Sequence, residues 1–151
     1  MAGDNLKSYL ELKVIWKDDD MFELSVTATN GQFFGATEVY DTSDALTSFA
    51  MSLFGYPKED KTLIHEAGQK DSYSYFAMKF YCIDNAGHVG VEVNLEENVS
   101  TQFRPEEKDK IKLEIIVEPN AIDNFQKQLL SLAQNEEGTA ILYGADNRLD
   151  T

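Results

Sequence analysis

The sequence has a single cysteine, Cys82. One cysteine cannot form an intramolecular disulfide, and it cannot supply the paired-cysteine motifs that bind structural zinc. The longest apolar runs extend over only a few residues, far short of the ~20 that a membrane-spanning helix requires. The beginning of the chain also lacks the basic and apolar regions of a signal peptide. We therefore expect a cytoplasmic protein with no membrane partner.

Basic residues are scarce too. The chain has 13 Lys and Arg residues against 27 Asp and Glu residues, which gives a net charge of −14. This charge repels phosphate backbones, so no nucleic-acid partner is expected. Two interpretations of the charge remain open: it maintains solubility, or it attracts a basic protein partner.

Signatures of catalysis and metal binding are missing as well. The sequence contains no glycine-rich phosphate loop and no nucleophile elbow. His65 and His88 belong to different predicted strands, and neither has a second His or Cys at metal-ligand spacing. Asp18-Asp19-Asp20 lacks the alternating ligands and the glycine of a calcium loop. We expect no catalytic residue, no metal and no cofactor.

The residues that are present suit one folded domain. A chain of 151 residues, 42% hydrophobic and 11% aromatic, can bury a sizeable core. Segments with alternating apolar and polar residues predominate, and two segments have helical spacing. We predict an α+β fold with two helices packed on a mainly antiparallel, curved or partly barrel-like sheet of about six to eight strands. The domain is expected to span residues 9–143, between a loose lead at 1–8 and a mobile tail at 144–151.

The first part of the chain predicts three antiparallel strands. Residues 10–16 and 22–28 alternate apolar with polar side chains, and the alternation places Leu10 and Trp16 on the same side. Asn30-Gly31 predicts a type I′ turn with these two residues at its centre. The turn fixes a register that pairs Ala28 with Phe33, Val26 with Gly35, Leu24 with Thr37 and Phe22 with Val39.

Two helices are predicted. The first follows Asp41, whose carboxylate can cap it, has Asp44 in its first turn and ends before Gly55-Tyr56-Pro57. The second begins at Pro119. A strand leads into each helix with the same spacing of inward residues, which predicts two β-rich halves that each end in a helix. The corresponding residues are Val39, Leu46, Phe49 and Leu53, and then Ile115, Ile122, Phe125 and Leu129, with Leu132 and Ala133 continuing the second set.

The clearest element is a long hairpin over residues 73–95, with Asp84-Asn85-Ala86-Gly87 as its loop. One face pairs Cys82 with Val89, Phe80 with Val91, Met78 with Val93 and Phe76 with Leu95. The other face pairs Tyr81 with Gly90, Lys79 with Glu92, Ala77 with Asn94 and Tyr75 with Glu96. The first face predicts core and an inert, buried Cys82 thiol, on the opposite side from His88. The second predicts a polar surface rich in tyrosine.

Three further strands are expected around this hairpin, at residues 63–67, 111–117 and 139–143, the last at an edge of the sheet. Residues 96–109 are polar and contain Pro105, which predicts a loop.

The tyrosine-rich face of the hairpin is the candidate binding surface. Large rings beside carboxylates are typical of a surface that selects a basic protein. Lys79 and Glu92 are expected to form an ion pair across the strands, and the Tyr81 ring to lie over Gly90. The alternative is that helices cover this face and make its tyrosines part of the core. The candidate residues are Tyr73, Tyr75, Tyr81, Glu92, Asn94 and Glu96, and Phe34 and Tyr40 could extend the surface.

The order of these segments resembles a known group of proteins. Leu12-Lys13-Val14-Ile15-Trp16, a hairpin, and then Thr37-Glu38-Val39-Tyr40 leading into a helix are similar to small acidic bacterial proteins of unknown function, over about residues 9–134. Some of these resemble the immunity proteins that accompany Wap-type contact-dependent toxins. The resemblance implies a cytosolic protein that neutralises a toxin by binding its active domain.

Two functions therefore follow from the sequence. The first is a non-catalytic acidic module that binds a basic protein, in the form of an immunity protein bound to a basic toxin domain. The alternative is a small-molecule binding domain that uses the concavity of the curved sheet. An enzyme has the least support, because no candidate acid, base or nucleophile is identifiable.

Overall fold

The computed structural model describes residues 7–59, 61–68, 74–98 and 108–145. Eight strands and two helices confirm the predicted α+β class. The elements in chain order are β1 (Tyr9–Lys17), β2 (Phe22–Thr29), β3 (Phe34–Asp41), α1 (Ser43–Leu53), β4 (Leu63–Gly68), β5 (Ser74–Cys82), β6 (Val89–Asn98), β7 (Lys108–Val117), α2 (Pro119–Asn135) and β8 (Thr139–Tyr143).

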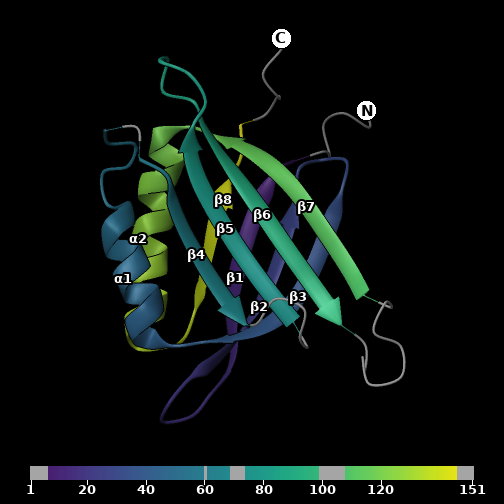
Figure 1. Ribbon diagram of the computed structural model, residues 1–151. Helices are drawn as coiled ribbons and strands as arrows, with labels where there is room; N and C mark the ends of the chain where they lie inside the picture. Colours follow the sequence, from purple (N-terminus) through teal and green to yellow (C-terminus); the bar gives the residue numbers. More distant parts are fainter. Residues whose placement is uncertain (1–6, 60, 69–73, 99–107, 146–151) are drawn as a thin grey trace.

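The strands form two antiparallel four-stranded sheets that do not close into a barrel. Sheet A has the order β3-β2-β1-β8, and sheet B has the order β4-β5-β6-β7. Each sheet is a three-stranded meander that leads into a helix, as the two predicted halves require. The strand after each helix then joins the other sheet: β4 follows α1 into sheet B, and β8 follows α2 into sheet A (Figure 1).

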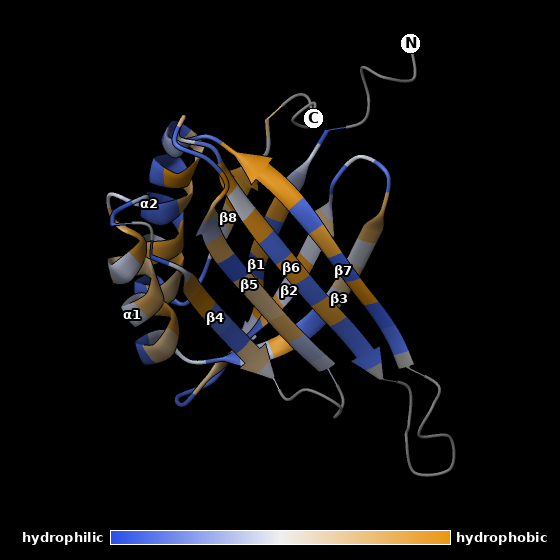
Figure 2. Cartoon of the chain, turned by 45° about the horizontal axis from the view of Figure 1, so that its top comes forward, coloured by the Kyte–Doolittle hydropathy of each residue, from blue (hydrophilic) through white to orange (hydrophobic). Residues whose placement is uncertain are grey.

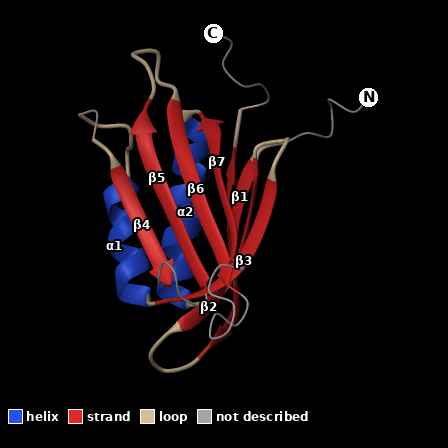
Figure 3. Cartoon of the chain, turned by 45° about the vertical axis from the view of Figure 1, so that its right-hand side comes forward, coloured by secondary structure: helices blue, strands red, loops and turns tan. Residues whose placement is uncertain are grey.

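Both helices pack at one side of the two sheets, beside β4 and β8 (Figures 1 and 3). Apolar residues alternate with polar ones along β6 and β7, as the banded strands of Figure 2 show. The inner faces of both sheets and the inward faces of both helices form one apolar core. Every inward helix residue that the spacing predicted is buried: Leu46, Phe49, Leu53, Ile122, Phe125, Leu129, Leu132 and Ala133.

The predicted register of the long hairpin is confirmed, from Cys82 opposite Val89 to Tyr75 opposite Glu96. The Ile83 amide donates to the His88 carbonyl (3.0 Å), which closes the four-residue loop. The strand β4 and the edge position of β8 are also as predicted. Within the described residues, neither helix is long and apolar enough to cross a membrane.

The Asn30-Gly31 turn has a different register from the predicted one. Ala28 pairs with Gly35 instead of Phe33, and the whole register is displaced by two residues. The reason is the Asn30 side chain, whose Oδ1 accepts hydrogen bonds from the amides of Gln32 (3.1 Å) and Phe33 (3.0 Å). Asn30 therefore lies at the first position of the turn, with Gly31 and Gln32 at its centre. An even displacement leaves each side chain on its predicted face.

Trp16 does not share a side with Leu10. The register between β1 and β2 shifts between Val14 and Trp16, which is a β-bulge at Ile15. One extra residue inverts the alternation, so the Trp16 side chain turns to the outer face and is 47% exposed. This bulge creates an exposed aromatic residue where the pattern predicted a core residue.

Asp41 is not the cap of α1. Thr42 is the N-cap, and its Oγ1 accepts a hydrogen bond from the Ala45 amide (3.3 Å). The Asp41 carboxylate is engaged elsewhere: Oδ2 lies 2.7 Å from Nε2 of His65, and Oδ1 accepts from the Thr42 amide (2.8 Å). The Asp41 carboxylate therefore pairs with His65 of β4 and does not cap α1 as predicted.

The loop predicted over residues 96–109 is shorter than expected. β6 continues to Asn98 and β7 begins at Lys108, because the pairs Glu96–Lys110, Glu97–Asp109 and Asn98–Lys108 extend the ladder. Backbone hydrogen bonding does not require apolar side chains, so a polar sequence is compatible with these strand ends. Pro105 and the tail after residue 145 lie outside the described residues.

Candidate functional site

The outer face of sheet B carries the tyrosine-rich surface that the hairpin predicted. Both helices lie on the other side of the sheet, so they do not cover this face (Figures 1 and 3). The register brings together Tyr75, Tyr81, Glu92, Asn94 and Glu96 on this face. Tyr73 lies outside the described residues.

Tyr75 and Glu96 offer little surface to a partner. Their exposed fractions are 7% and 5%. The Tyr75 hydroxyl donates to a carboxylate oxygen of Glu66 on the neighbouring strand β4. Burial first, and then this hydrogen bond, raise the pKa of Tyr75 well above its usual value, so the hydroxyl remains protonated. Tyr75 is thus held in a local hydrogen bond.

Tyr81 is also held by its neighbours. Its hydroxyl donates to Glu114 on β7, and burial together with that hydrogen bond raises the pKa of Tyr81. A Cβ atom on Gly90 would overlap with Cε2 of Tyr81, so the ring covers the glycine as predicted. The Lys79 ammonium lies 5.9 Å from the centre of the same ring.

The expected Lys79–Glu92 ion pair is wrong. Glu92 forms its ion pair with Lys112 on β7 (3.6 Å), and its other oxygen accepts from the Asn94 amide nitrogen (3.1 Å). Lys79 instead lies over the Tyr81 ring, where a cation is attracted by the π-electrons. The sequence could not distinguish these arrangements, because Lys112 becomes a neighbour of Glu92 only when β7 joins the sheet.

The ring over Gly90 leads to a first prediction. Gly90→Ala should lower the free energy of unfolding by about 1 kcal/mol, because the new methyl group displaces the Tyr81 ring and its hydrogen bond to Glu114. Urea denaturation followed by circular dichroism measures this change. In a Tyr81→Ala background the obstacle is gone, so the same substitution should cost nothing. An equal cost in both backgrounds would contradict the stacking.

The remaining titratable groups form local pairs. His88 Nδ1 lies 2.8 Å from Oδ2 of Asp84, in an exposed pair at the hairpin loop. The hydrogen bond from His88 and that from the Ala86 amide lower the pKa of Asp84. Cys82 is half-buried, with Sγ 4.0 Å from the Tyr56 hydroxyl oxygen. In the described part of the chain, no group of three or more His, Cys, Asp or Glu side chains could hold a metal ion.

The outer face of sheet A carries a second aromatic surface, which the sequence identified only in part. Tyr40 and Phe34 of β3 were expected to extend the tyrosine-rich surface of the hairpin, and this is wrong because β3 belongs to sheet A. Both side chains do face outward, with exposed fractions of 52% and 62%. The bulge in β1 adds Trp16 to the same face, and β8 adds Tyr143, which is 57% exposed. We call this surface the aromatic face; its members are Trp16, Glu23, Phe34, Glu38, Tyr40 and Tyr143.

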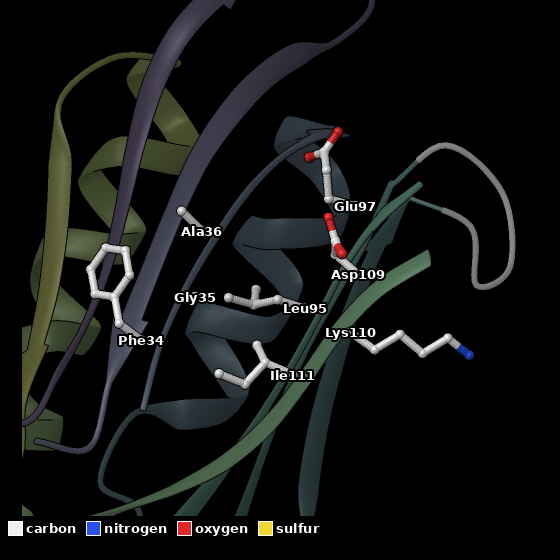
Figure 4. A pocket seen from close by; sticks show the side chains of 8 residues that line it. All are labelled: Phe34, Gly35, Ala36, Leu95, Glu97, Asp109, Lys110 and Ile111. Carbon is white, nitrogen blue, oxygen red and sulfur yellow. The ribbon is translucent and has the colours of Figure 1, made fainter. Parts of the chain in front are cut away.

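A groove of about 330 Å³ lies where the outer edge of sheet A meets sheet B. Leu95 and Ile111 extend from β6 and β7 toward Gly35 of β3, and Glu97 and Asp109 lie together at one end (Figure 4). The Lys110 side chain points away from them (Figure 4). The β3 wall of the groove is the segment Phe34–Ala36, which makes the groove continuous with the aromatic face.

We compared the chain with protein-family models, curated proteins and solved structures, and none of the three comparisons found a match.

Proposed function

We propose that this chain is a non-catalytic protein-binding module that binds a basic protein through the aromatic face. Following the resemblance to immunity proteins, the proposed partner is a basic toxin domain that binding neutralises. The observation that supports the proposal is the gathering of exposed aromatic side chains on one sheet of a chain with a net charge of −14. Aromatic residues are enriched in protein interfaces, and exposed apolar patches are uncommon elsewhere on soluble proteins.

One end of the aromatic face combines rings with a carboxylate. Glu23 pairs with Trp16 on one side and with Tyr40 on the other, across three adjacent strands. The two rings meet edge to face, with their centres 6.0 Å apart. A lysine or arginine of a partner placed here would meet both π-electrons and negative charge, which is the chemistry that attracts a cation.

The Glu23 carboxylate is destabilised in the free protein. Partial burial first, and then the negative charge of Glu38, raise its pKa above the usual value. A positive charge beside it would offset the repulsion from Glu38 and lower the pKa again. The part of the aromatic face around Glu23 and Glu38 is therefore suited to a basic side chain of a partner.

The outer face of sheet B is less favourable as the main contact. Its tyrosine hydroxyls already donate to Glu66 and Glu114, and Glu92 is paired with Lys112. A partner would have to compete with these contacts, whereas Trp16 and Tyr40 offer exposed rings. Binding by Tyr75, Glu92 and their neighbours on sheet B stays a prediction.

The alternative function, a small molecule in the concavity of the sheet, has less support. The inner faces of the sheets carry core side chains, and Phe76, Phe80 and Phe125 in that core have no exposed surface. A ligand in the central part of the space between the sheets would have to displace such side chains, which costs packing energy.

Substitution of the two rings beside Glu23 tests the proposal. Trp16→Ala with Tyr40→Ala should weaken binding to the captured basic protein at least tenfold, about 1.4 kcal/mol or more, because exposed aromatic residues are typical energetic centres of interfaces. The partner is captured from the native host at low salt and identified by mass spectrometry, and its affinity is then measured by calorimetry. Added salt should slow association, because screening weakens electrostatic attraction.

The matched control removes exposed apolar surface elsewhere. Met51 and Phe54, at the end of α1, are 60% and 65% exposed, and their replacement by alanine should leave binding unchanged. Equal binding by wild type and the Trp16/Tyr40 variant would contradict the role of the aromatic face. A captured partner with an acidic net charge would contradict the electrostatic argument.

A further inference from the structure

The groove between β3 and sheet B has an apolar floor, which depends on a glycine in β3. A Cβ atom on Gly35 would lie 2.6 Å from Cγ2 of Ile111 and 3.1 Å from Cδ1 of Leu95. The missing side chain lets two branched residues of sheet B reach the backbone of β3. The floor can therefore receive an apolar stem, and about 330 Å³ lies at the lower end of the volumes of small-ligand sites.

Two carboxylates lie together at one end of this apolar floor. Glu97 and Asp109 are directly opposite each other on β6 and β7, an arrangement of like charges that is unfavourable in a sheet. The Thr37 hydroxyl lies 2.7 Å from Oε1 of Glu97, which orients that carboxylate without neutralising it. Neither carboxylate forms an ion pair with another of the described residues.

We propose that this groove binds the side chain of a lysine or an arginine, with its methylene stem between Ile111 and the Phe34–Ala36 segment of β3 and its cation between Glu97 and Asp109. Lysine and arginine share the chemistry that the groove offers, an alkyl chain that ends in a positive charge. That the bound lysine or arginine belongs to the protein partner rests on the proposed function. Because Phe34 and Ala36 belong to β3 and line the groove, a protein on the aromatic face could reach the groove without crossing the sheet.

The groove can be tested without the partner. Butylguanidinium and butylammonium, as mimics of the arginine and lysine side chains, are titrated across the millimolar range into the isotope-labelled full chain and followed by amide chemical shifts. We expect either cation or both to perturb the amides of Gly35, Leu95 and Ile111. Neutral butylurea, which resembles the guanidinium in shape, should bind at least tenfold more weakly. No perturbation by either cation, or equal binding of butylurea, would overturn the proposal.

A charge variant and a matched control locate the binding. Glu97→Gln with Asp109→Asn should weaken cation binding at least tenfold, and its melting temperature should not fall, because the substitution removes a like-charge pair. Glu118→Gln with Asp123→Asn makes the same change of net charge around the start of α2, and it should leave cation binding unchanged. If both variants bind the cation as wild type does, the groove proposal fails.

The same variants separate this inference from the proposed function. Loss of partner binding in the Trp16/Tyr40 variant with full binding in the Glu97/Asp109 variant would support the aromatic face and reject the groove as the seat of a partner residue. The opposite result is also possible: the groove binds the cation mimics, but the Trp16/Tyr40 variant still binds the partner. This result would support the proposed chemistry of the groove and reject the aromatic face as the interface.

Discussion

Phe80→Ala is expected to lower the free energy of unfolding by about 3–5 kcal/mol, the range for an aromatic residue removed from a packed core. Phe80 has no exposed surface. Its ring centre lies 5.9 Å from that of Phe49 on α1 and 6.4 Å from that of Phe125 on α2. Tyr56 meets the same ring edge-on at 6.2 Å. Phe80 therefore joins both helices to sheet B, and its loss leaves a cavity where three elements meet.

Urea denaturation followed by circular dichroism measures this loss. Phe33→Ala is the matched control, because the Phe33 side chain is 60% exposed and its removal should change the free energy of unfolding by less than about 0.5 kcal/mol. Phe80→Leu should lie between the two, since it retains much of the buried volume. A cost for Phe80→Ala as small as that of Phe33→Ala would mean that the helices do not pack on β5 in this way.

The sequence could predict the parts of the fold that depend on neighbouring residues. The register of the long hairpin follows from a short loop and from two faces of opposite character, and both are local. The turn at Asn30 shows the limit of such reasoning, because the dipeptide identified the turn while the Asn30 side chain determined its register. The helix faces were predictable because burial at helical spacing leaves a clear pattern.

Other features depend on contacts between distant segments. The return of β8 to the side of β1 has no local signal, because any exposed edge of either sheet could have accepted that strand. Asp41 is a reasonable helix cap by its position, but the fold brings His65 to it from β4. The composition of β1 does not indicate the bulge at Ile15, although the bulge inverts the side on which Trp16 lies.

In the candidate site, too, some features follow from neighbouring residues and others depend on contacts between distant strands. Composition and pairing placed Tyr75, Tyr81 and Glu92 correctly on one face of the hairpin. Their hydrogen-bonding partners Glu66 and Glu114 come from the flanking strands β4 and β7, whose positions beside the hairpin were not predicted. Exposure, which distinguishes a ring available for binding from one already in use, is therefore a property of the assembled sheet.

The buried pair of Asp41 and His65 gives the second large prediction. Their side chains are 5% and 6% exposed, and Oδ2 of Asp41 lies 2.7 Å from Nε2 of His65. The His65 ring also packs against Phe49, with centres 5.4 Å apart. Removing one partner leaves the other without its hydrogen bond in a site that is largely shielded from water. His65→Ala and Asp41→Ala should each lower the free energy of unfolding by about 3 kcal/mol or more.

The chain contains its own control for this pair, since Asp84 and His88 form the same kind of contact at 2.8 Å with side chains 39% and 33% exposed. Water can replace either partner there, so His88→Ala should cost far less than His65→Ala. In a double-mutant cycle, Asp41→Ala with His65→Ala should cost less than the sum of the single substitutions, because no polar partner is left unsatisfied. Strictly additive costs would show that each side chain stabilises the junction of β3, β4 and α1 by packing alone.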